Sequence, residues 1–384
     1  MANIIDYVMW RGDIPVSQVP LGEVDALVLS YLAYMPFGEA GAGGFGGEEI
    51  LLSDAAAYFL VHGLASTCMM DSEKEDCRLL TAVAESERFG SMRVTGYTDC
   101  YDKAAEEQFA AVTFVPESGP AFVAFRGTDS TVIGWKEDFN MSFSREVPAQ
   151  RAAAVYILEA ADMLAMPLIA GGHSKGGNLA VYASVFAPQE IRTRIACVYN
   201  FDGPGFNEDV IALPQFREAD MRVHTFVPQS SVIGMLLWHA EPFTVVRSEA
   251  SGLFQHNPYT WQVMGGRMIT LAERTRESRL AEETIKHWLT GLSPETREQV
   301  IDGIYAVLSV SDGRNVSDLF EGRNVRAILR AVGDMDEETK DVIMGAFRQL
   351  GGSLKETIPE WIDRAADDIR AMIAKKSAGR EDKA

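Results

Sequence analysis

One segment of the chain combines the residue types of a serine nucleophile with the spacing that such a nucleophile needs. Residues 172–176 read Gly-His-Ser-Lys-Gly, an apolar run at 168–170 precedes them, and a helical pattern at 178–185 follows. On a sharp turn from strand to helix, glycines two residues before and after the serine let the two elements pack closely while the hydroxyl stays accessible. The start of the helix also points N–H groups at developing negative charge. The segment predicts a nucleophile elbow at Ser174; the alternative is a glycine-rich loop without chemistry.

A serine nucleophile needs a general base, and in a parallel sheet that base follows the nucleophile in the chain. Four histidines follow Ser174. His256 comes after an apolar run at 243–246 and after Gly252, and it precedes an Asn-Pro pair at 257–258 that is typical of a helix start. Because a base belongs in the loop after the last strand, we predict this role for His256. The alternative is a loop histidine with no role.

The other three histidines have less suitable positions. His224 lies inside a predicted strand and is expected to face the core or a helix. His239 ends an apolar, helix-like run at 232–238 and could line a pocket. His287 shares a helix face with Trp288, for which core packing is the expectation.

A carboxylate usually stands behind the base. Asp202 directly follows the apolar run 195–201 and enters a glycine-rich turn at 203–205, so it is the predicted acid. An aspartate that only caps this turn is the competing interpretation. Glu241 and Glu249 flank the last predicted strand and are weaker rivals.

An oxyanion hole takes one N–H from the residue after the nucleophile, here Lys175, and a second from an earlier loop between strand and helix. Residues 125–129 read Phe-Arg-Gly-Thr-Asp and end a predicted strand, so Thr128 is the expected second donor. The side chain of Lys175 has two interpretations. It contacts an acidic group of the substrate, or it is solvated at the start of an exposed helix.

Substrate contacts are predicted at three residues around this constellation. An acyl chain needs an apolar pocket, and the runs near the predicted base and acid supply aromatic and aliphatic side chains. For each of these residues, ordinary core packing is an equally good interpretation. The predicted substrate-binding residues are His173, Met235 and Trp238, within a wider pocket of 231–238, Phe254, Tyr259 and Trp261.

Apolar runs of strand length alternate with helical patterns before residue 268, which predicts an α/β fold. Such strands form a mostly parallel, doubly wound sheet with right-handed crossovers. Besides the run before Ser174, the predicted strands are 93–98, 109–114, 121–125, 195–201, 221–227 and 243–246. Besides the helix after Ser174, the predicted helices are 22–35, 53–65 and 148–164.

From residue 268 onward the pattern is helical, and no strand signal remains. The sequence therefore predicts a domain at 1–267, with N-terminal helices and the sheet, and an all-helical appendage at 268–384 with a frayed, charged end. The helices predicted in this appendage are 268–280, 282–291, 295–308, 316–333, 337–351 and 356–374.

Composition limits the function classes. The 384 residues are 47% hydrophobic and carry a net charge of -20, which disfavours nucleic acid and anionic membrane surfaces as partners. The four cysteines are dispersed without a metal-binding spacing, and we expect thiols in a reducing compartment and no metal. The N-terminal segment lacks the pattern of a signal peptide, and no apolar run is long enough for stable membrane insertion. A cytoplasmic protein is expected.

Residues 41–46 match the Gly-x-Gly-x-x-Gly pattern of dinucleotide sites by letters alone. That site requires a strand before the turn and a helix after it. Here the preceding segment, 22–35, has a helical pattern, and two glutamates follow at 48–49, where phosphate would bind. We therefore predict a connector at this place and no cofactor.

Further segments resemble a known family. Phe-Arg-Gly-Thr at 125–128, Trp-Lys-Glu-Asp-Phe at 135–139 and Gly-His-Ser-Lys-Gly-Gly-Asn-Leu-Ala at 172–180 resemble the class 3 lipase family of α/β-hydrolases. The resemblance implies an α/β-hydrolase fold with Ser174 as nucleophile, His256 as base and Thr128 in the oxyanion hole. The chain is also similar, over roughly residues 1–265, to a bacterial hydrolase-like family of unknown function; the segments concerned are 6–13, 201–206, 227–234 and 255–256.

The chain departs from the class 3 pattern at two positions. That family has its catalytic aspartate just before a Val-Pro pair, a place that Thr225 holds here, ahead of Phe226 and the pair at 227–228. The acid is therefore relocated, with Asp202 favoured, or absent. Lys175 also replaces the usual apolar residue after the serine.

Together these features predict a serine ester hydrolase that acts on small-molecule or lipid acyl esters through an acyl-enzyme. The alternative is a lipid- or protein-binding scaffold that keeps the hydrolase fold without catalysis. A peptidase built on the same residues has no separate signal in the sequence.

Overall fold

The computed structural model describes residues 1–64, 66–68, 72–129, 132–218, 223–291, 293, 295–299 and 301–302. The chain divides into two compact units, Met1–Arg279 and Leu280–Ala384. The helices predicted at 316–333, 337–351 and 356–374 lie outside the described residues, as does half of the one predicted at 295–308. The predicted division at 267–268, with its all-helical appendage, therefore stays a prediction.

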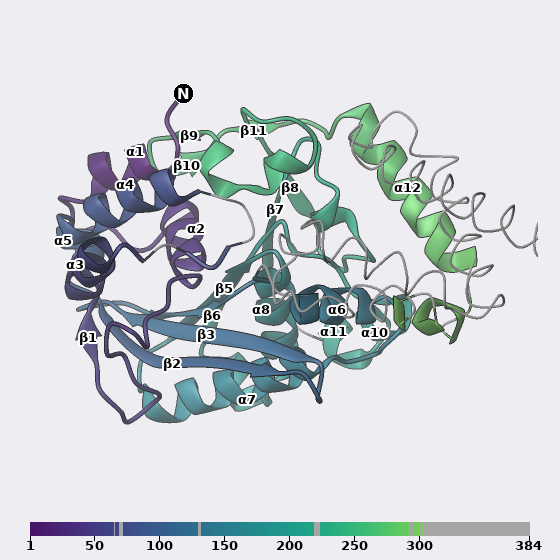
Figure 1. Cartoon of the computed structure of the whole chain (residues 1–384), viewed down its shortest axis with the longest axis horizontal. Helices are drawn as coiled ribbons and strands as arrows, with labels where there is room; N and C mark the ends of the chain where they lie inside the picture. Colours follow the sequence, from purple (N-terminus) through teal and green to yellow (C-terminus); the bar gives the residue numbers. More distant parts are fainter. Residues whose placement is uncertain are drawn as a thin grey trace, which may run out of the picture. The chain divides into compact units, whose positions relative to one another are not determined.

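A nine-stranded mixed sheet forms the framework of the first unit (Figure 1). Strands β4 to β8 pair in parallel, and the strands at both edges are antiparallel. The predicted α/β fold is confirmed. In spatial order the strands are β1 (Ile50–Leu51), β2 (Arg93–Asp102), β3 (Glu107–Val115), β4 (Ala121–Phe125), β5 (Leu168–His173), β6 (Ile195–Phe201), β7 (Val223–Pro228), β8 (Phe243–Val246) and β11 (Thr270–Leu271).

Strands β4 and β5 are buried on both faces of the sheet, and β4 shows how. Successive side chains of a strand point to opposite faces. Phe122 and Ala124 join a core that includes the N-terminal helices, whereas Val123 and Phe125 join a second core with α7 (Pro148–Met163) and α8 (Lys175–Phe186). The parallel strands follow one another in chain order without a reversal. Helices α7 and α8 cover one face of the sheet, and the N-terminal helices cover the other. The second layer of helices is therefore not produced by a reversal of the strand order.

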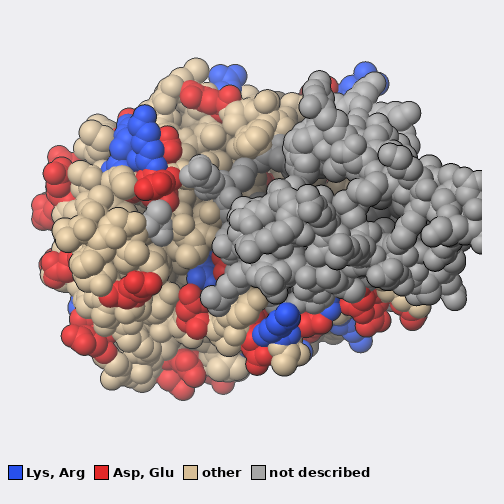
Figure 2. Space-filling view, in the orientation of Figure 1, with Lys and Arg blue, Asp and Glu red and all other residues tan. Residues whose placement is uncertain are grey.

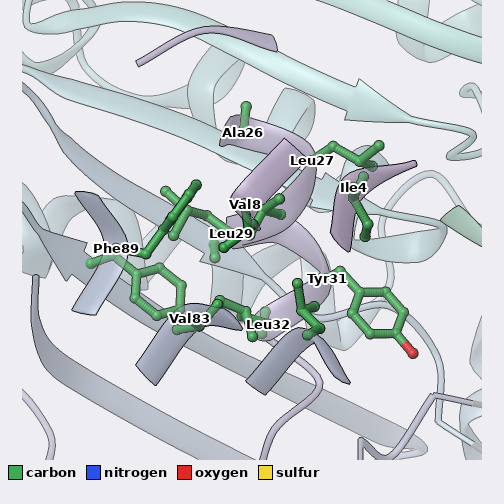
Figure 3. Packing of buried hydrophobic residues seen from close by; sticks show 14 of the residues in the cluster. Ile4, Val8, Ala26, Leu27, Leu29, Tyr31, Leu32, Val83 and Phe89 are labelled. Atoms are coloured by element: carbon green, nitrogen blue, oxygen red, sulfur yellow. The ribbon is translucent and has the colours of Figure 1, made fainter. Parts of the chain in front are cut away.

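The N-terminal layer packs around α2 (Glu23–Leu32), in which every residue from 24 to 32 is buried. A helix that is buried on all sides must be covered by further elements. In Figure 3, Val8 of α1 (Ile4–Arg11) and Val83 of α4 (Glu73–Ala84) lie among its aliphatic side chains. Among the described helices, none is long and apolar enough to cross a bilayer.

Several elements differ from the sequence predictions. Helix α4, whose first turn is acidic, was not among the predicted helices. The helix predicted at 268–280 is wrong, since β10 (Arg267–Met268) and β11 come first and α12 (Arg276–Gly291) begins only afterwards. The apolar run 232–238 forms a single 3₁₀ turn, η1 (Ile233–Met235).

Candidate active site

Ser174 lies on a strained turn between β5 and α8. Its φ and ψ angles are 59° and -135°, and its N–H donates to Phe201 O at 2.9 Å. A side chain on either flanking glycine would collide with backbone: a Cβ on Gly172 would lie 2.2 Å from the Gly176 carbonyl carbon, and one on Gly176 would lie 2.1 Å from Phe125 O. Only glycine permits this approach. Ser174 itself is half-buried.

His256 and Asp202 form a hydrogen-bonded pair near this turn. His256 Nδ1 lies 2.7 Å from Asp202 Oδ2, and both residues are buried. The second carboxylate oxygen accepts the hydroxyl of Ser231 at 2.5 Å. Asp202 itself has a positive φ of 52°, which turns the chain sharply after β6. A carboxylate on Nδ1 holds the proton there and leaves Nε2 as a proton acceptor.

Contacts of His173 bring His256 toward Ser174. The rings of His173 and His256 lie with centroids 4.5 Å apart, tilted by 37°, and His173 precedes Ser174 directly. Within the described part of the chain, no hydrogen bond joins the Ser174 hydroxyl to His256. In ligand-free enzymes such bonds are often long and shorten only when substrate binds.

The buried ring of His173 bonds to residues on both of its nitrogens. Its Nε2 lies 2.8 Å from His256 O, and its Nδ1 lies 3.1 Å from the Tyr34 hydroxyl. Burial, followed by the effect of His256, lowers the pKa of His173 well below its ordinary value, so the ring stays neutral. Because both ring nitrogens bond within the protein, the predicted contact of His173 with substrate is wrong. Its contacts instead hold the loop that carries His256.

The loop of His256 is also tethered to the N-terminal helices. The hydroxyls of Tyr259 and Tyr31 both donate to Asp76 Oδ1 at 2.8 Å. Asn257 Nδ2 donates to Ser72 Oγ at 2.9 Å. Sequence reasoning missed this tether. The partners are 183 positions apart in one hydrogen bond and 185 in the other, and no local sequence pattern links residues at such separations.

The predicted oxyanion loop lies against Ser174. A Cβ on Gly127 would lie 3.0 Å from Ser174 Cβ, so the backbone before Thr128 passes close to the serine. The Thr128 hydroxyl donates to Asp138 Oδ2, on α6 (Val132–Asn140). The backbone N–H groups of Thr128 and Lys175 are the predicted oxyanion donors. Neither of them donates a hydrogen bond to an acceptor in the described ranges. Two N–H groups thus stand available beside Ser174.

Asp138 is electrostatically unusual. Its side chain keeps 34% of its surface exposed, yet its Oδ1 is buried and accepts no hydrogen bond from the described residues. Burial raises the pKa of Asp138 to about 6, against the opposing charge of Lys175. The carboxyl group that holds Thr128 therefore titrates near neutral pH.

The side chain of Lys175 fits neither predicted interpretation. It is fully buried, so it is neither solvated nor in contact with substrate. Its Nζ donates to Glu137 Oε2 at 2.9 Å and to two oxygens of Gln108, at 2.8 and 3.0 Å. An ammonium group is buried only when its donors are paired.

The rival carboxylates form hydrogen bonds with groups other than His256. Glu241 accepts from Thr225 at 2.6 Å and lies 3.2 Å from His239 Nδ1, and Glu249 binds the N-terminal amine at 2.6 Å. His287 is exposed, so the core packing expected of it is wrong. His224, expected to face the core or a helix, is exposed and its ring stacks on Tyr199.

The remaining predicted pocket residues divide between core and surface. Met235 is buried against Val227 and Val245, as core packing requires. Trp238 is half-buried, and its backbone pairs with Phe206. Phe254 is 72% exposed, two residues before His256. In the described ranges, histidine, cysteine and acidic side chains form no cluster that could hold a metal ion.

A mixed sheet whose fifth strand ends in a strained serine turn, followed directly by a helix, defines an α/β-hydrolase fold. A profile of the Mbeg1-like family matches residues 83–306, which is more than half of the chain. The chain belongs to the Mbeg1-like family. No curated protein matches it.

Among solved structures the chain is similar to fungal lipases. The lipase–propeptide complex of Rhizomucor miehei has 13% identity, with 41% of this chain and 57% of that chain covered and a TM-score of 0.32. A fungal lipase–inhibitor complex has 12% identity, with 52% and 82% covered and a TM-score of 0.34. Lipase II from Rhizopus niveus has 13% identity, with 59% and 79% covered and a TM-score of 0.33.

Proposed function

We propose that this protein is a serine hydrolase of acyl esters, with Ser174 as nucleophile, His256 as general base and Asp202 as the acid behind it. One observation carries the proposal. His256 Nδ1 lies 2.7 Å from a buried carboxylate, next to a serine with a positive φ on an elbow turn. Strain of this kind is kept where function requires it.

The chemistry follows from these positions. His256 Nε2 takes the proton of the Ser174 hydroxyl while Oγ attacks the ester carbonyl carbon. The carbonyl electron pair moves to oxygen, and the backbone N–H groups of Thr128 and Lys175 stabilise that oxyanion. His256 then donates its proton to the leaving alcohol as the acyl-enzyme forms. Water, activated by the same imidazole, releases the acid and restores the serine.

The substrates that this proposal favours are esters with an apolar acyl group. Two exposed aromatic side chains lie close in sequence to residues of the site: Phe139 beside Asp138, 49% exposed, and Phe254 near His256. Apolar surface at these places suits an acyl chain. The predicted cytoplasmic location stays an expectation and fits the thiol state of all four cysteines.

Labelling with a fluorophosphonate tests the nucleophile. We expect the protein to be labelled covalently and Ser174→Ala to remove both the label and the hydrolysis of p-nitrophenyl esters. Ser53→Ala, on α3 (Leu52–His62) in the N-terminal layer, is the control and should behave as the parent protein does. Full labelling of the Ser174→Ala protein would refute this assignment.

The scaffold alternative relied on the missing acid at Thr225. The pairing of Asp202 with His256 supports a relocated acid and weakens that reasoning. A parent protein that binds lipids, hydrolyses no ester and resists the fluorophosphonate would favour the scaffold. Loss of hydrolysis in His256→Ala, in a protein that remains folded, would favour the enzyme.

A further inference from the structure

The buried ammonium of Lys175 has a complete set of acceptors. Its three protons meet Glu137 Oε2, Gln108 O and Gln108 Oε1, and the side chains of Lys175 and Glu137 have no exposed surface. Removing two charges from water costs several kcal/mol per ion, and a buried ion pair is therefore weak support for stability alone. We therefore consider whether this ion pair positions the elements around it.

Glu137 connects four elements through its two carboxylate oxygens. Oε2 accepts from Lys175 Nζ in α8 and from Gln108 N in β3, at 3.1 Å. Oε1 accepts from Ala149 N at the start of α7, at 2.8 Å. Glu137 itself belongs to α6. The carboxylate thus fixes α6 against the first residue of the elbow helix.

The neighbours of this ion pair are the two predicted oxyanion donors. Lys175 supplies one backbone N–H directly. Asp138, the residue after Glu137, accepts the hydroxyl of Thr128, which supplies the other. One ion pair between adjacent helices therefore sets the position of both donors, although neither charged side chain can reach a substrate.

We propose that the Glu137–Lys175 ion pair is a positioning device that fixes the spacing of the two oxyanion donors. The inference rests on the proposed hydrolase function. Donors must meet the oxyanion at hydrogen-bond distance, and a misplacement of about 1 Å costs on the order of 10²-fold in rate. The lysine after the nucleophile is then explained by its partner on α6 and not by substrate specificity.

The test uses full-length Glu137→Gln and Lys175→Met proteins with a p-nitrophenyl ester and a trifluoromethyl ketone. The ketone forms a reversible adduct: Ser174 Oγ bonds to the carbonyl carbon, the electron pair moves to oxygen, and His256 takes the proton. We expect kcat to fall about 10- to 100-fold with KM unchanged, and the affinity for the ketone to fall by the same factor, because only the oxyanion is affected.

Asp25→Asn is the matched control. Asp25 forms a buried ion pair with Arg88 at 2.7 Å, in the N-terminal layer. Loss of the Asp25 charge should lower the midpoint of thermal unfolding, as loss of the Glu137 charge does. It should leave kcat and the affinity for the ketone unchanged.

The outcomes separate the two proposals. If the parent protein hydrolyses the ester while Glu137→Gln and Lys175→Met lose only thermal stability, the positioning role is overturned and the hydrolase stands. A folded Glu137→Met/Lys175→Met protein that recovers stability without kcat supports the role, since two apolar side chains fill the space without holding the helices in register. A parent protein without labelling or turnover overturns both.

Discussion

At the scale of single residues, the site is defined by where one carboxylate lies. The register of β6 and β7 sets Asn200 beside Thr225 and Phe201 beside Phe226. Asp202 continues β6 by one residue, and its N–H donates to Phe226 O at 2.8 Å. A carboxylate at the end of β6 therefore lies beside the end of β7, and it still reaches the loop of His256.

Replacing Asp202 by asparagine tests this placement. We expect Asp202→Asn to lower kcat for ester hydrolysis by about 10⁴, because an amide favours the wrong tautomer of His256 and cannot stabilise the imidazolium. Glu241→Gln is the control, because Glu241 bonds to Thr225 and lies beside His239. Steady-state kinetics at neutral pH give the answer. The reverse pattern, with loss in Glu241→Gln only, would assign the acid to Glu241.

Asp138 predicts a pH effect on stability. Because burial raises the pKa of Asp138 to about 6, the folded protein holds this proton more tightly than the unfolded chain. Its contribution to the free energy of unfolding is present at low pH and is lost as pH rises from about 4 through about 6. Compared with the parent protein, Asp138→Asn should gain thermal stability over this window. Melting curves that keep a constant separation at every pH would contradict the prediction.

The sequence predicts only part of the site, and the reason is chain separation. Ser174, Asp202 and His256 each follow a strand, and strand ends can be recognised from apolar runs. The partner of Lys175 is Glu137, 38 residues earlier on another helix, and Ser231 lies 29 residues from Asp202. Charge and hydroxyl pairs across elements depend on packing distances, which no local pattern encodes.

At the scale of elements, close backbone packing around the serine turn sets the geometry. Strand β5 lies between β4 and β6, and α8 packs on all three. The strands 195–201 and 243–246 agree with their predicted bounds, because both are apolar runs bounded by turn residues. Helix 268–280 was predicted wrongly because short edge strands have too few residues for a period-2 pattern.

Substitution of Gly172 measures how tightly strand and helix pack. We expect Gly172→Ala to lower the free energy of unfolding by about 1–3 kcal/mol or more, since the new methyl group overlaps the backbone of Gly176. Gly44→Ala is the control, because a Cβ there meets nothing within 4 Å. Urea titration of both proteins checks this. Equal midpoints for the two variants would show that the turn can relax.

At the scale of the whole molecule, negative charge dominates. The chain carries 55 acidic and 35 basic residues, and acidic side chains are spread over the described surface in Figure 2. Long-range repulsion from anionic polymers and anionic lipid surfaces follows. The sequence predicts this property completely, because it depends on composition and not on the fold.

Vesicle flotation tests this property. We expect the protein to stay unbound from vesicles of phosphatidylserine and phosphatidylcholine at low salt, where charge repulsion is least screened. Vesicles that contain a cationic lipid serve as the opposite control and should bind it. Binding to the anionic vesicles that survives high salt would indicate an apolar membrane contact instead.

The tether from Asp76 and Ser72 to the histidine loop has a practical consequence for anyone who shortens this protein. The family match begins at residue 83, which makes it a natural starting point for a recombinant fragment. Such a fragment would omit Asp76 and Ser72, and with them the acceptors of Tyr259 and Asn257. It would keep Ser174, Asp202 and His256 and yet release the segment that carries the imidazole. We therefore expect a shortened version to need the N-terminal helices for the proposed activity.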